Sequence, residues 1–202
     1  AVARVDLNLE ALMLPSTYRN LDRYKQAVFE LNRVLHLQDR SGSTAVSLAN
    51  YQDRNLSAVN RGDLIRTFES PEKNPFFPYF ERRLSEIMED DRPRLVGFSL
   101  NFLSQALCTF AMIGALRRLD PTIRIILGGG LITSWMSSPA WKNPFRGLID
   151  HCLAGCGEDQ LLELFGSGSR SGLGRFSYKD LSLADYLAPG GVLPYAASHG
   201  CY

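Results

Sequence analysis

Three short apolar runs in this sequence each end in glycine or serine, the residue types that let a backbone approach a bound ligand. The runs are "PRLVGFSL", "TIRIILGGG" and "GLIDHCLAGCGED". Glycine has no Cβ to obstruct a ligand, and it permits positive φ in a tight turn. At any single site, the ordinary need for glycine between a strand and a helix explains the residue equally well. Three such turns along one edge would instead leave a long slot for a ligand.

The candidate ligand-binding residues follow directly from these three turns. They are Ser99, Leu100, Asn101, Gly128, Gly129, Gly130, Gly155, Gly157 and Glu158. A first-turn helix carboxylate is an equally good account of Glu158. The chain contains neither G-x-G-x-x-G nor G-x-x-x-x-G-K-[ST], so a dinucleotide or P-loop phosphate site is not indicated.

Cysteine and histidine side chains could in principle hold a metal. Cys152 and Cys156 are four residues apart, with His151 beside them. A strand alternates its faces, so His151 and Cys152 would point in opposite directions. No second Cys/His cluster completes a tetrahedral site, and we therefore do not expect zinc here.

The residues around these turns alternate between strand and helix patterns. A strand is expected at 93–99 and a second at 122–128, with an apolar helical stripe at 103–119 between them. A third strand ends at Ala154-Gly155, and a short helix, "EDQLLELFG", ends at Gly166. Buried parallel strands are continuous apolar runs of this kind. The order predicts an α/β, Rossmann-like, doubly wound and mainly parallel sheet with flanking helices.

The first 91 residues give a less regular pattern. Alternating Val2, Val5 and Leu7 predict a strand that ends near Leu9. An amphipathic helix follows, capped by Ser16 or Thr17. The polar segment 38–75 is expected to be an irregular insertion, with a possible short strand at 44–48. Apolar residues from Phe77 to Ile87 predict another helix.

Composition limits the classes of partner. The chain has 202 residues, is 45% hydrophobic, and carries 22 basic and 21 acidic residues for a net charge of +1. This balance gives no field that would hold nucleic acid or an anionic membrane. No apolar run is long enough to span a bilayer, and no signal-peptide pattern opens the chain. We expect a cytoplasmic protein whose four cysteines are reduced.

Three motifs resemble a known family. "VGFSL", "IILGGGLITS" and "CLAGCGEDQLLEL" are similar to strand-loop units of cobalamin (vitamin B12) binding domains, in particular those at the N-terminus of radical S-adenosylmethionine (radical SAM) enzymes. Ser99 matches the family's loop serine, and Gly128 and Gly129 match its Gly-Gly turn. Residues 155–158 match its last turn, with cysteine in place of the first glutamate. The resemblance covers about 90–166, together with "VDLNLE" and the C-terminal tail.

The resemblance implies a particular mode of cobalamin binding. Family members that supply a lower cobalt ligand use Asp-x-His-x-x-Gly, and none of His36, His151 and His199 lies in that pattern. We therefore expect cobalamin to bind base-off, with its dimethylbenzimidazole displaced and no histidine of this chain on cobalt.

The end of the chain is similar to the start of a radical SAM domain. In the family, Cys-x-x-x-Cys-x-x-Cys holds a [4Fe-4S] cluster whose fourth iron binds S-adenosylmethionine. "PYAASHGCY" resembles the approach to that motif, which makes Cys201 the first cluster ligand in a longer parent protein. A single thiolate cannot hold the cluster, so this fragment alone is not expected to be catalytic.

The resulting hypothesis divides the chain at residue 166. Residues 1–166 form a cobalamin-binding-like domain with the 38–75 insertion, and 167–202 form a Gly/Ser linker and an extended tail that starts the radical SAM domain. The parent would be a methyltransferase or related radical enzyme, whose partners are its own radical SAM domain and an unknown substrate. The alternative is a non-catalytic module that has lost cobalamin and serves as a docking domain. A flavodoxin-like or receiver domain is a third possibility, but no acidic cluster suited to phosphorylation follows the strands.

Overall fold

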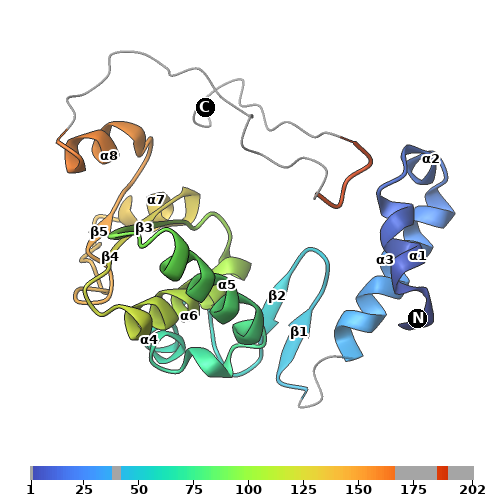
Figure 1. The fold of residues 1–202 in the computed structure, drawn as a ribbon, viewed down its shortest axis with the longest axis horizontal. Helices are drawn as coiled ribbons and strands as arrows, with labels where there is room; N and C mark the ends of the chain where they lie inside the picture. Colours follow the sequence, from blue (N-terminus) through green and yellow to red (C-terminus); the bar gives the residue numbers. More distant parts are fainter. Residues whose placement is uncertain (1, 38–41, 167–185, 191–202) are drawn as a thin grey trace. The chain divides into compact units, whose positions relative to one another are not determined.

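The computed structural model describes residues 2–37, 42–166 and 186–190 (Figure 1). The chain divides into two compact units. One comprises Ala1–Asn50 with Gly172–Tyr202, and the other Tyr51–Ser171. The predicted linker and tail, including Cys201, lie outside the described residues except for 186–190.

The first unit is built mainly from helices. Its elements are η1 (Val2–Arg4), α1 (Val5–Leu12), α2 (Pro15–Tyr18), α3 (Leu21–Leu37) and β1 (Thr44–Val46). Helices α1 and α3 pack through a small apolar cluster of Ala11, Leu12, Ala27 and Leu31. The possible strand at 44–48 is present as the shorter β1.

The predicted first strand is wrong, because residues 5–12 form helix α1. Three alternating apolar residues are too few to distinguish a strand from a helix. The three-to-four residue spacing of Val5, Leu9 and Leu12 also fits a helix, and Leu, Glu and Ala at 9–12 favour one. Burial of Ala11 and Leu12 against α3 favours the helix over the strand. The part of the family resemblance that treated "VDLNLE" as a strand is corrected accordingly.

The helix predicted from Ser16 is present as two pieces, the first of which begins at Pro15. Short α2 ends at Tyr18, and α3 starts at Leu21. The Asn20 side chain accepts a hydrogen bond from the Arg23 amide at 3.1 Å, which is the N-cap role predicted for Ser16 or Thr17.

The second unit contains the parallel sheet. Its elements are β2 (Tyr51–Asp53), α4 (Arg61–Glu69), η2 (Pro71–Lys73), α5 (Phe77–Asp90), β3 (Leu95–Ser99), α6 (Leu103–Leu119), β4 (Arg124–Gly128), α7 (Gly130–Met136), β5 (His151–Cys152) and α8 (Glu158–Leu164). Strands β3, β4 and β5 are adjacent in that order and all parallel. The α/β class and the flanking helices are therefore confirmed. Strand β5 ends two residues before the predicted Ala154.

Segment 38–75 is not irregular where it is described. It contains β1, β2, α4 and η2, and α4 makes the most extensive helix contact of the unit, against α6 (Figure 1). Leu64 of α4 is almost fully buried. The Asn60 side chain caps α4 by accepting a hydrogen bond from the Asp63 amide. The sequence obscured this helix because it is rich in polar residues, two of which, Asp63 and Thr67, are buried.

The core of the second unit is supplied mainly by β4 and α6. The largest fully buried side chains of these two elements are Ile125, Leu127, Phe110, Ile113 and Leu116, and Ile123, just before β4, is also fully buried. Strand β4 is central in the sheet, and three consecutive residues, Ile125, Ile126 and Leu127, are buried. Helix α7 adds to this packing, because its Trp135 lies against Phe145 with ring centroids 6.2 Å apart.

We predict that Gly114→Ala destabilises the second unit. A Cβ at Gly114 would overlap the backbone carbonyl of Phe68 in α4, so α4 and α6 would have to separate. The expected loss in unfolding free energy is about 1 to 3 kcal/mol, as for other overpacked contacts. Urea unfolding followed by circular dichroism measures it. Gly97→Ala is the control, since a Cβ there meets no atom within 4 Å. Equal unfolding midpoints for the two variants would contradict the close α4–α6 contact.

Candidate functional site

The three predicted turns meet at the carboxyl-terminal edge of the sheet. Ser99, the last residue of β3, pairs with Gly128, the last residue of β4. Leu127 of β4 pairs with Cys152, and the backbone amide of Leu153 still donates to Leu127 at 2.9 Å. Parallel strands thus bring the loops after 99, 128 and 152 to one edge, as expected for ligand sites in open α/β sheets.

The first two loops are locked by a close backbone contact. The Leu100 amide donates to the Gly128 carbonyl at 2.7 Å, and the Leu131 amide donates to the Leu100 carbonyl at 3.1 Å. Gly129 has φ of +103°, and a Cβ there would lie 2.5 to 2.8 Å from the backbone of Leu100. Only glycine fits this turn. The Leu100 side chain is fully buried, so Leu100 supports the site through its backbone.

Asn101 joins the same two loops through its side chain. Its Oδ1 accepts from the Gly130 amide at 2.9 Å, and its Nδ2 donates to Ser99 Oγ at 3.1 Å. Gln105 Oε1 accepts from the amides of Asn101 and Phe102, both at 3.1 Å. Sequence reasoning missed Gln105, although a Gln three residues after a helix N-cap is a known capping signal.

The third loop is held by Thr133 of α7, another residue that sequence reasoning missed. The Gly155 amide donates to Thr133 Oγ1 at 2.9 Å, and Thr133 Oγ1 donates to the Gly129 carbonyl at 3.0 Å. Gly155 has φ of +71°. Gly157 precedes α8 and Glu158 is exposed in its first turn, so the predicted residues of this loop lie at the same edge.

The edge exposes polar groups beside an apolar surface. Ser99, Asn101, Gly130 and Gly155 are exposed to solvent. Next to Asn101, Phe102 is 66% exposed and Leu103 is 45% exposed, which is unusual for such large apolar side chains. Residues 99–103, 128–133 and 153–157 contain no Lys or Arg, while Glu158 and Asp159 are exposed in α8. The surface is therefore rich in amide and hydroxyl groups and lacks cations.

His151 and Cys152 lie in β5, and Cys156 lies in the loop that follows it. Among the described residues, no group of three or more His, Cys, Asp or Glu side chains could hold a metal ion. Burial raises the pKa of the Cys152 thiol, which keeps it protonated at neutral pH. The His151 Nε2 lies 3.2 Å from Nη2 of Arg124, the first residue of β4.

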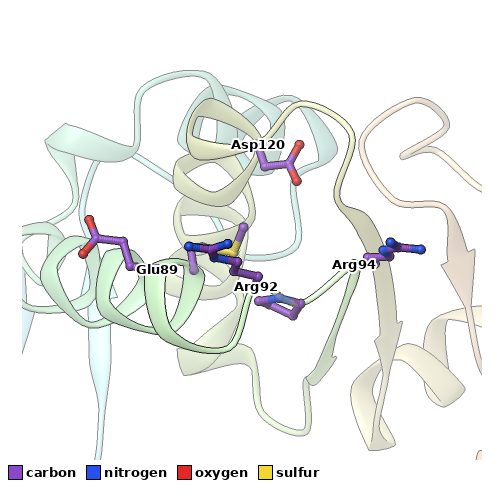
Figure 2. Close-up of a pocket in the computed structure, with 6 residues that line it drawn as sticks. Glu89, Arg92, Arg94 and Asp120 are labelled. Carbon is purple, nitrogen blue, oxygen red and sulfur yellow. The ribbon is translucent and has the colours of Figure 1, made fainter.

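One hollow lies away from this edge, and another borders its third loop at Leu153. The first, of about 440 Å³, is lined by Met88, Glu89, Arg92, Pro93, Arg94 and Asp120, where β3 begins and α6 ends. Figure 2 shows the Arg92 and Arg94 side chains pointing away from each other, and Glu89 pointing away from both. These charges do not converge on one ligand. The other, of about 420 Å³, lies between β5 and α8.

Comparisons with known proteins identify no relative. No protein-family model matches the sequence, and no curated protein and no solved structure is significantly similar to it. None of the helices in the described ranges is long and apolar enough to cross a membrane. Function must therefore be inferred from the residues at the sheet edge.

We predict that Gly129→Ala disrupts this edge and that Gly130→Ala does not. Alanine at 129 would adopt an unfavourable φ and clash with the Leu100 backbone, at an expected cost of about 1 to 3 kcal/mol in unfolding free energy. Alanine at 130 meets only Asn101 Oδ1, at an ordinary 3.6 Å, in a helical position. Chemical denaturation of both variants measures the difference. Equal stabilities would contradict the observed turn geometry.

Proposed function

We propose that this chain is the cobalamin-binding domain of a radical SAM enzyme, and that it binds the corrin base-off at the carboxyl-terminal edge of β3, β4 and β5. The observation that carries the proposal is the meeting of all three glycine- or serine-bearing loops at one edge, joined by side-chain and backbone hydrogen bonds. We also propose that the sheet and its flanking helices form a Rossmann-like, doubly wound domain.

The chemistry of the edge fits cobalamin better than a phosphate ligand. A nucleotide phosphate is usually bound by Lys, Arg or a glycine-rich loop at a helix N-terminus. The three loops carry no cation. A glycine-rich turn does precede the seven-residue helix α7, but the Gly130 amide there already donates to Asn101 Oδ1. The corrin periphery carries amide groups, which the Ser99 hydroxyl and the second N–H of the Asn101 side-chain amide could hydrogen-bond. Phe102 and Leu103 supply an apolar surface for the macrocycle.

The placement of the histidines supports base-off binding without a protein ligand on cobalt. His36 lies in α3 of the other unit, and His151 contacts Arg124. His199 lies outside the described residues. None of the three edge loops contains histidine.

The parent reaction is part of the proposal. Bound cobalamin would supply the cobalt centre for methyl transfer or a related radical reaction. Ser99, Asn101, Gly128, Gly129, Gly130, Gly155, Gly157 and Glu158 would hold and orient it. Cys201, outside the described residues, would be the first [4Fe-4S] ligand of the parent's radical SAM domain.

We predict that the purified protein retains cobalamin. After mixing with hydroxocobalamin and desalting, the visible spectrum should show corrin absorption with a base-off signature. A colourless protein would contradict the proposal and favour the alternative, a docking module that does not bind the cofactor.

A matched pair of variants localises the binding. Gly130→Trp places a large side chain at the exposed C-terminal edge, where it should block the corrin and abolish retention. Thr122→Trp places the same side chain at an exposed position two residues before β4, at the opposite end of the strand, and should leave retention unchanged. Equal retention by the two variants would place cobalamin elsewhere on the protein.

A further inference from the structure

The third loop of the edge is anchored by few contacts. A Cβ at Gly155 would meet no atom within 4 Å, so the loop is open to solvent on that side. The Gly155 amide donates to Thr133 Oγ1 at 2.9 Å. Within the described residues, this is the only hydrogen bond that joins the loop at 154–157 to α7. Gln160 of α8 also holds the loop, because its Nε2 donates to the Ala154 carbonyl at 2.7 Å and to the Cys156 carbonyl at 3.5 Å. The Thr133 hydroxyl is therefore the group that ties Gly155 to α7.

The Thr133 hydroxyl is itself fixed in direction. It donates to the Gly129 carbonyl at 3.0 Å and accepts from Gly155, so both of its hydrogen-bonding functions are used. Gly129 in turn is held against the backbone of Leu100. The hydroxyl thus holds the third loop at a fixed distance from the Gly129 turn.

The first turn of α7 lies between the other two loops. Its Gly130 amide is bound by Asn101, which comes from the loop after β3. Its Thr133 hydroxyl is bound by Gly155, which comes from the loop after β5. One helical turn thereby connects both outer loops to the centre of the edge.

We infer that Thr133 is a positioning residue, which fixes the third loop so that the three loops bind their ligand as one preorganised surface. The ligand part of this inference rests on the proposed function. Preorganisation matters because a loop that must be ordered on binding reduces affinity. The motif "IILGGGLITS" includes Thr133, but the sequence alone assigned it no role.

Thr133→Val tests the inference, because valine keeps the branched shape and removes the hydroxyl. In the ligand-free protein, hydrogen exchange of the Gly155 amide, measured by NMR, should become roughly fivefold faster, the effect of losing one ordinary hydrogen bond. Affinity for hydroxocobalamin, measured by spectroscopic titration, should fall by a similar factor, roughly fivefold. Thr133→Ser restores the hydroxyl and should rescue both.

Thr122→Val is the matched control, because Thr122 also uses its hydroxyl in a hydrogen bond, to Asp120 Oδ1 at 2.7 Å, but lies at the other end of β4. It should change neither Gly155 exchange nor affinity. Unchanged Gly155 exchange in Thr133→Val overturns the positioning role. Faster exchange with unchanged cobalamin affinity overturns its importance for the ligand.

The two proposals can fail separately. If the wild-type protein binds no cobalamin, the proposed function and the ligand part of this inference are both overturned. Gly155 exchange in the ligand-free variants then still decides whether Thr133 fixes the loop.

Discussion

The close approach of the Gly129 turn to the Leu100 backbone is the contact on which the candidate site depends. A side chain at 129 would occupy space that Leu100 already fills. Because this contact holds, the Leu100 amide reaches Gly128 and the Leu131 amide reaches Leu100. The loop after β3 and the turn after β4 therefore form one unit of structure, and polar groups at their ends stay exposed in defined positions. Any ligand at this edge would meet a surface fixed mainly by backbone contacts.

The helices of the second unit support that edge indirectly. Helix α6 starts at Leu103, directly after the first loop, and its buried Phe110 packs against Phe145 with ring centroids 4.7 Å apart. Helix α4 reaches α6 closely because Gly114 leaves room for the Phe68 backbone. With α6 held in this way, the loop between β3 and α6 ends at a fixed position. Core packing and the geometry of the site are thus connected through one helix.

The sequence predicted the apolar strands and the apolar helix α6 better than helices α1 and α4, for physical reasons. Buried strands such as β4 are uninterrupted apolar runs between turn residues, and α6 carries a long apolar stripe, so both were predicted with nearly their observed limits. Residues 5–12 are ambiguous by pattern, and tertiary burial made them helical. Helix α4 is short and polar on most of its surface. Glycines marked the three loops, but the roles of Thr133 and Gln105 depend on contacts between loops that no local pattern encodes.

The most direct test of the central claim is to locate cobalt on the protein. Crystals grown with cobalamin should be measured at the cobalt absorption edge, where an anomalous difference map identifies the metal without prior assumptions. We expect one cobalt peak above the carboxyl-terminal ends of β3, β4 and β5, beside Asn101, Gly129 and Gly155, and no histidine of this chain coordinating it. A cobalt peak at the opposite end of the sheet, or bound to a histidine, would contradict this account.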